Sequence, residues 1–146
     1  MPIDALAAEH FSLGLPAEVN LVGLAVGVRP ELLWQPFDPE GAMQVRFAVG
    51  IAAGPELLFV PVDLGLRVRW FPQQRVHLLT GAGWELQTIH AARIDSVVRS
   101  AFYMELGLEV EVTESWSVGG MAEVDFAPPP VFGFGAAARL GVTREF

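Results

Sequence analysis

The sequence predicts an all-β protein, an antiparallel up-and-down transmembrane β-barrel of eight strands with an apolar exterior and a polar, glycine-rich, filled lumen. Hydrophobic residues make up 52% of the 146 residues, yet no apolar run approaches the ~20 residues that a membrane-spanning helix needs. Apolar and polar residues alternate instead with a period of two, as in strands whose two faces differ. The 15 Gly and 11 Pro interrupt the chain at short intervals, which favours many short elements joined by turns.

The alternation is clearest in three segments, residues 58–70, 102–112 and 132–146. In the last segment only Arg144 interrupts the apolar row, and the opposite face carries mainly glycine, small and charged residues. A helix would scatter these residues around its circumference. Each segment is therefore predicted to form one strand long enough to cross a bilayer.

Weaker alternation predicts five more strands, at residues 11–15, 22–28, 43–51, 76–87 and 116–126. Turn-forming residues predict the breaks between the strands, at residues 16–18, 35–41, 53–55, 72–74, 88–95, 113–114 and 128–130. Because most breaks are short, consecutive strands should pair as antiparallel hairpins. We expect one β-barrel domain over residues 1–146, with residues 1–9 as an N-terminal extension.

The glycines indicate which face of the barrel points inward. They recur on the polar face, where they would weaken an exposed strand, but in a narrow barrel interior they leave room for long Arg and Glu side chains. The apolar rows also have six or seven members, more than strands of about 5–6 residues require. The apolar face is therefore predicted to meet lipid. The alternative is a soluble, lipocalin-like barrel that buries its apolar face around an apolar small molecule.

The C-terminal segment 139–146, which ends in Phe146 and carries Gly141, resembles the closing strand of small outer-membrane barrels of the OmpA, OmpX and OmpW type. Arg144 departs from that pattern, since the family would place an apolar residue there. The resemblance implies a porin-like barrel in the outer membrane of Gram-negative bacteria. It also implies two partners, membrane lipid and the outer-membrane assembly machinery, which reads the C-terminal strand as its signal.

The inward face is predicted to hold a network of arginines and carboxylates, because charges held away from bulk water must be paired. Folding the hairpins about their turns places Arg46 opposite Asp63, Glu85 opposite Arg99, and Glu105 opposite Glu123. The two glutamates need an arginine between them, supplied by Arg67, Arg69 or Arg139. The full predicted network comprises Arg46, Asp63, Arg67, Arg69, Glu85, Arg99, Glu105, Glu109, Glu123 and Arg139.

Such a network would plug the lumen of an eight-stranded barrel, whose interior is about wide enough for side chains alone. We therefore expect an integral outer-membrane barrel that has a structural or unassigned role and no open pore. A narrow outer-membrane channel is an alternative. Aromatic residues near strand ends are expected at the two membrane interfaces: Trp34, Trp70, Trp84, Trp116 and Phe146.

Composition argues against several other functions. The net charge of −8 provides no basic patch, so a nucleic-acid partner is not expected. The chain has no Cys, and its three histidines lack a metal-ligand spacing, so neither a metal site nor a cofactor is expected. The start of the chain lacks the basic and apolar regions of a signal peptide, so we expect an unexported protein or a mature form with an added Met.

Catalysis is not expected, although one segment allows an alternative. His90 lies in the predicted 88–95 loop, with Asp95, Ser96 and Ser100 nearby in sequence, and these residues could supply a base, an acid and a nucleophile. No Gly-x-Ser-x-Gly motif supports them. A lipid-modifying barrel enzyme would need His90 and a serine within hydrogen-bond distance.

Overall fold

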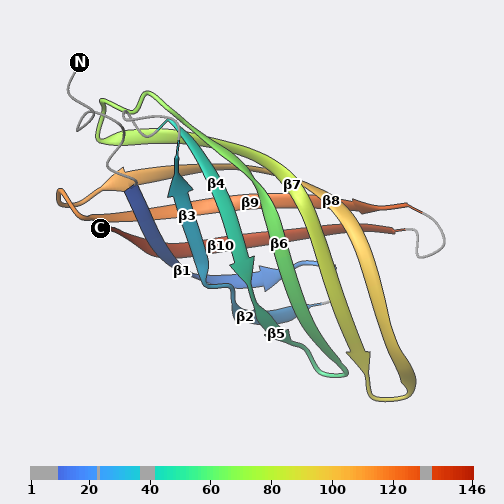
Figure 1. Ribbon diagram of the computed structural model, residues 1–146. Coiled ribbons are helices and arrows are strands. Elements are labelled where there is room, and N and C mark those ends of the chain that lie inside the picture. Colours follow the sequence, from blue (N-terminus) through green and yellow to red (C-terminus); the bar gives the residue numbers. More distant parts are fainter. Residues whose placement is uncertain (1–9, 23, 37–41, 129–132) are drawn as a thin grey trace.

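The computed structural model describes residues 10–22, 24–36, 42–128 and 133–146. These residues form ten strand segments: β1 (His10–Asn20), β2 (Ala25–Val28), β3 (Glu31–Gln35), β4 (Met43–Val49), β5 (Ile51–Ala53), β6 (Leu57–Trp70), β7 (Val76–Ala91), β8 (Ile94–Glu111), β9 (Trp116–Ala127) and β10 (Gly133–Glu145) (Figure 1). Within the described ranges, no helix is long and apolar enough to cross a membrane.

The ten segments make a closed antiparallel barrel of eight strands, which confirms the predicted fold class. β2 and β3 form one strand, because both pair with β1 in the same register, and β4 and β5 likewise both pair with β6. The remaining strands pair with their neighbours in sequence, and β10 pairs with β1 to close the barrel. Both interruptions lie beside prolines, which cannot donate to the ladder: the nitrogen of Arg29 bonds the oxygen of Pro16, and that of Gly50 bonds the oxygen of Pro61.

The register fixes the stagger of the barrel. Stepping between directly opposed residues once around the wall leads from Trp116 to Phe126 on the same strand, β9, a displacement of ten residues. The outward-facing row on this path is Trp116, Arg144, Leu13, Leu32, Phe47, Leu64, Trp84, Phe102 and Phe126. With eight strands, this stagger tilts the strands by about 41° and raises the row by about 25 Å per circuit.

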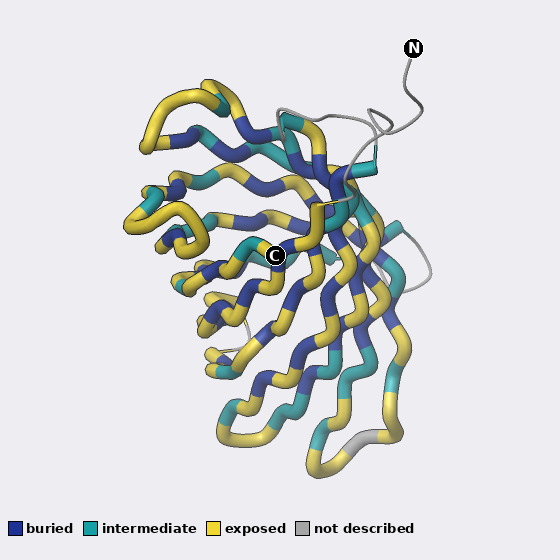
Figure 2. The backbone as a smooth tube through the Cα atoms, turned by 60° about the vertical axis from the view of Figure 1, so that its left-hand side comes forward, coloured by how far each residue is buried: buried dark blue, intermediate teal, exposed yellow. Residues whose placement is uncertain are grey.

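Burial alternates along every long strand (Figure 2). The exposed residues of these strands are mainly apolar, and the buried residues include the charged ones. The outward face of β8, for example, exposes Phe102, Met104, Leu106 and Leu108, whereas Glu105 between them is 5% exposed. This arrangement is the inverse of a soluble globular fold. The interior is therefore not the apolar pocket that the lipocalin-like alternative requires.

One predicted turn is wrong, and another is shorter than predicted. Pro16 to Glu18 lie inside β1, which is twice as long as predicted, because the ladder continues in one register on both sides of Pro16. The predicted 88–95 loop is instead the end of the β7–β8 hairpin, whose turn is Ala92 and Arg93. Thr88, His90 and Asp95 lie in the two strands of this hairpin, and β8 continues there beyond its last pair with β9. The predicted extension 1–9, most of the 35–41 turn and part of the 128–130 turn lie outside the described residues.

The two ends of the barrel differ in the turns they carry. β1 begins and β10 ends at one end, which we call the terminal end, together with the turns at 71–75 and 112–115. The opposite, distal end carries the turns at 54–56 and 92–93.

Candidate functional site

The interior of the barrel contains a concentration of buried charge. Six arginines and eight carboxylates are buried there: Arg29, Arg46, Arg67, Arg69, Arg99, Arg139, Glu18, Glu31, Asp63, Glu85, Glu105, Glu109, Glu123 and Asp125. Each of the eight barrel strands contributes at least one of them, because the two-residue period points alternate side chains inward. Such charges are tolerated in an interior only when they are paired.

Arg29 is the centre of the distal half of this network. Its Nη1 lies 3.0 Å from Asp63 Oδ2, 2.7 Å from Glu85 Oε2 and 3.3 Å from Glu123 Oε1, and its Nη2 donates to Glu18 Oε1 at 2.7 Å. These acids belong to β6, β7, β9 and β1 respectively. A single guanidinium thus connects four strands across the lumen.

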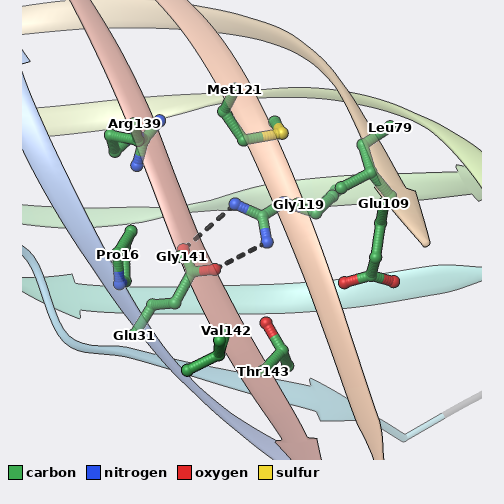
Figure 3. A pocket seen from close by; sticks show the side chains of 11 residues that line it. Pro16, Glu31, Leu79, Glu109, Gly119, Met121, Arg139, Gly141, Val142 and Thr143 are labelled. Carbon is green, nitrogen blue, oxygen red and sulfur yellow. Dashed lines mark hydrogen bonds and ion pairs between the residues drawn. The ribbon is translucent and has the colours of Figure 1, made fainter. Parts of the chain in front are cut away.

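Arg46 and Arg67 organise the terminal half. Arg67 binds Glu31 through two parallel hydrogen bonds of 2.9 and 3.0 Å, which appear in Figure 3, and its Nε donates to Glu105 at 2.7 Å. Arg46 donates to Glu31 at 2.6 Å and to Asp63 at 3.0 Å. Since Asp63 also contacts Arg29, it joins the two halves.

Arg139 provides a second connection between the halves. Its Nη2 lies 2.8 Å from Glu105 and 2.5 Å from Glu123. These two glutamates are directly opposed on β8 and β9, as the register predicted. The arginine therefore separates two like charges that would otherwise repel each other.

Smaller groups lie towards the two mouths of the barrel. At the terminal end, Arg69 contacts Glu109 and Glu145, each at 2.9 Å, and His77 Nε2 lies 2.8 Å from Glu111. Nearer the distal end, Arg99 binds Asp125 at 2.5 Å and also contacts Gln87 at 3.1 Å and the oxygen of Gly133 at 2.8 Å.

The structure places all ten residues of the predicted network inside the barrel, and each takes part in at least one ion pair. Two of the predicted cross-strand oppositions are wrong, although the ion pair predicted for Arg46 and Asp63 is present. Asp63 is opposite Ala48, because the β5–β6 turn is centred one residue later than predicted, yet the long Arg46 side chain still reaches it. Arg99 is opposite Gln87, and Glu85 binds Arg29 and Gln87 instead.

Four charged members were missing from the predicted network: Glu18, Arg29, Glu31 and Asp125. Glu18 was assigned to a turn, and Glu31 lay between predicted strands. Arg29 and Asp125 were already on the polar face of their segments, so the two-residue period alone could have found them.

Interior glycines make room for these side chains. A Cβ on Gly65 would collide with the Tyr103 hydroxyl, and one on Gly135 with the Asp125 carboxylate. The Tyr103 hydroxyl in turn accepts a hydrogen bond of 3.2 Å from Arg46. Around Arg67, the network leaves a cavity of about 30 Å³ that is lined by Glu31, Arg67 and Glu109 among others (Figure 3). That volume suits one or two water molecules.

Glu85, Glu123 and Asp125 are close enough together to hold a metal ion. Each carboxylate, however, is already paired with an arginine: Glu85 with Arg29, Glu123 with Arg139 and Asp125 with Arg99. The positive charge that a cation would supply is therefore already present.

The predicted interfacial aromatics lie on the outer wall in two groups. Near the terminal end are Trp70, Trp116 and Phe146, together with Trp34, which stacks on Phe11 at 6.5 Å. Further towards the distal end, Trp84 meets Phe102 edge-on at 4.2 Å, and Phe126 packs on Phe134 at 5.2 Å.

His90 and Ser96 meet the distance requirement set out for an enzyme. His90 Nδ1 lies 2.5 Å from Ser96 Oγ, and both side chains are exposed on the β7–β8 hairpin. Within the described ranges no carboxylate is hydrogen-bonded to His90, so the group that would orient the imidazole is missing from the pair.

A closed eight-stranded barrel with an apolar outer wall and a charged interior is the architecture of transmembrane β-barrels. No family model matches the sequence, and no curated protein matches it. Solved structures do match the fold. The N-terminal β-barrel domain of Pseudomonas aeruginosa OprF superposes with a TM-score of 0.79 at 13% identity, over 94% of this chain and 97% of that one.

Two further outer-membrane proteins are similar. A major outer membrane protein from Thermus thermophilus gives a TM-score of 0.70 at 13% identity, over 96% of this chain and 100% of that one. OprG from Pseudomonas aeruginosa gives 0.61 at 10% identity, over 96% of each chain. The chain thus has the fold of eight-stranded outer-membrane barrels.

Proposed function

We propose that this protein is an integral outer-membrane barrel of structural role whose lumen is plugged by its arginine–carboxylate network. The observation that carries the proposal is the contrast between the two faces of the wall: the charges inside are ion-paired, and the exposed residues outside are mainly apolar. Water solvates an exposed apolar wall unfavourably, whereas the hydrocarbon chains of lipid solvate it favourably.

The height of the apolar wall supports membrane embedding. The row from Trp116 to Phe126 rises by about 25 Å, the height of the apolar band in transmembrane barrels. Aromatic side chains lie at both ends of this rise, as they do at the two interfaces of a bilayer. The fold that the chain shares with outer-membrane proteins favours that membrane over others.

The continuity of the network supports a closed lumen. Arg29, Arg46, Arg67 and Arg139 connect carboxylates from both halves of the barrel. The cavity of about 30 Å³ beside Arg67 and Arg139 is too small for a hydrated ion. Among the described residues, the distal turns at 54–56 and 92–93 are short, so these two turns offer little surface for adhesion.

Refolding from urea with and without detergent micelles tests the embedding. We expect a compact β form, resistant to unfolding on an unheated gel, only when micelles are present. A stable β form in plain buffer would contradict the proposal. Planar-bilayer recordings of the refolded protein test the plug: we expect no discrete conductance, and discrete openings would establish the narrow channel instead.

The contact between His90 and Ser96 favours one second candidate function, hydrolysis of a lipid ester. Its test is cleavage of a long-chain p-nitrophenyl ester by the refolded protein. Ester cleavage that disappears in Ser96→Ala and persists in Ser100→Ala would establish it. Equal background rates for all three proteins would exclude it.

A further inference from the structure

Arg144 stands apart from every other charged residue of the barrel wall. Among the described strand residues outside the register shift at the tip of the β7–β8 hairpin, it is the one Asp, Glu, Lys or Arg on the outward-facing rows, and it is exposed. No carboxylate of the described residues forms an ion pair with it. Charge on the outer wall of a membrane barrel is costly unless it meets a partner.

Two aromatic rings hold the Arg144 side chain against the wall. Its guanidinium carbon lies 5.5 Å from the centre of the Trp116 ring and 4.9 Å from that of Phe146. A guanidinium held by ring faces still presents its N–H groups at its edge, in a geometry that fits two oxygens of one phosphate. Arg144 is thus positioned to bind an anion at the level of the terminal-end aromatics.

An apolar groove begins at Arg144 and continues along the outer wall. It has a volume of about 760 Å³, within the range of about 300–1,000 Å³ for ligand pockets. Its lining includes Leu13, Leu15, Leu32, Phe47, Val49 and Val142. By the stagger of the barrel, Val49 lies about 14 Å further from the terminal end than Arg144, towards the middle of the apolar band.

An anionic phospholipid has a charged phosphate and an apolar acyl chain. The cation Arg144 matches the phosphate, and the apolar groove that leads away from it matches the acyl chain. We propose that this groove binds an anionic phospholipid, with the phosphate at Arg144 and an acyl chain along Leu13, Leu32 and Phe47. The proposal rests on the proposed membrane embedding. It gives a function to the residue that departs from the closing-strand pattern of outer-membrane barrels.

A second copy of the chain fits this surface less well. A two-fold interface would place the groove against itself and bring the two Arg144 side chains towards each other. Two concave surfaces leave a gap, and two unpaired cations repel. Charge complementarity therefore favours a phosphate-bearing lipid.

Tryptophan quenching by brominated lipids tests the site, because Trp116 lines the groove. One protein keeps only Trp116 (Trp34→Phe, Trp70→Phe, Trp84→Phe). The other keeps only Trp84, which lies on β7 outside the groove. Each is reconstituted in phosphatidylcholine vesicles that contain a minor fraction of brominated phosphatidylglycerol or, in parallel, of brominated phosphatidylcholine.

We expect Trp116 to be quenched about fivefold more efficiently by the phosphatidylglycerol, the preference that one surface arginine provides. Trp84 should be quenched equally by both lipids. Arg144→Gln should remove the preference at Trp116. Leu15→Phe, which narrows the groove, should weaken the preference for phosphatidylglycerol. Leu106→Phe, outside the groove, is the matched control and should leave the preference unchanged, since the two leucines are 56% and 57% exposed.

The outcomes separate the two proposals. Equal quenching of Trp116 by both lipids, or a preference unchanged in both Arg144→Gln and Leu15→Phe, would overturn the lipid site while Trp84 still reports embedding. Quenching of Trp84 with none at Trp116 would indicate that another copy covers the groove. Absence of quenching at both tryptophans would overturn the embedding itself.

Discussion

Glu105 and Glu123 lie directly opposite each other on β8 and β9, and both accept a hydrogen bond from the same nitrogen of Arg139. Two carboxylates in direct cross-strand opposition destabilise a sheet unless a cation lies between them. Arg139, 4% exposed, provides that cation from β10. Three consecutive strands are thus joined by one charge cluster as well as by their ladder.

Replacing Arg139 by alanine should therefore lower stability strongly. The change leaves Glu105 and Glu123 buried and facing each other, and breaking a buried ion pair costs about 3–5 kcal/mol. Urea unfolding of the refolded protein in micelles measures the loss. Arg75→Ala, in the exposed turn before β7, is the matched control and should change little. Adding Glu123→Gln to Arg139→Ala should restore part of the loss; no restoration would mean that repulsion is not its cause.

Arg29→Ala should destabilise the barrel more than Arg46→Ala. Arg29 contacts four carboxylates, whereas Arg46 contacts two and the Tyr103 hydroxyl. Both arginines are buried, so desolvation of the guanidinium is similar and the number of unpaired acids decides the order. Parallel urea titrations give the two unfolding free energies. A larger loss for Arg46→Ala would mean that Arg29 is not the centre of the network.

The alternation of apolar and polar residues carried most of the fold information. It specified eight strands, because the two-residue period survives a shift of strand ends, and the glycines on the polar face then indicated that this face points inward. It could not specify exact partners, since a turn centred one residue later moves every opposed pair by two. The Arg46–Asp63 contact survives that shift because arginine is long.

The sequence was less informative where a residue lies in an element that its type normally disfavours. Pro16 normally marks a turn, but here it lies within β1, and Glu18 beyond it was lost from the predicted network. The lipid groove was also beyond sequence reasoning, because Leu13, Phe47 and Val142 come from three strands that only barrel closure brings together. The sequence showed Arg144 as an exception in the apolar row, but it could not show the contacts of Arg144 with the Trp116 and Phe146 rings.

Gly65→Ala should be destabilising, because the added methyl group would meet the Tyr103 hydroxyl and the backbone oxygen of Ala82. Overpacking of this kind costs about 1–3 kcal/mol. Gly120→Ala is the control: a Cβ there meets its nearest neighbours at 3.7 and 3.8 Å, an ordinary contact distance. Urea unfolding of the two variants should separate them clearly. Equal unfolding free energies for the two variants would show that the side chains around Gly65 can move to accommodate an extra methyl group.

Arginine substitutions on the outer wall should cost stability according to depth. Leu140 lies on the same strand as Arg144, four residues and about 10 Å nearer the middle of the apolar band. Leu140→Arg should therefore cost about 2–4 kcal/mol in lipid vesicles, whereas Met43→Arg, at the terminal end of β4, should cost about 0–1 kcal/mol. Both residues are exposed, at 67% and 47%. In water neither change would bury a charge, so equal and small costs in vesicles would contradict a lipid-facing wall.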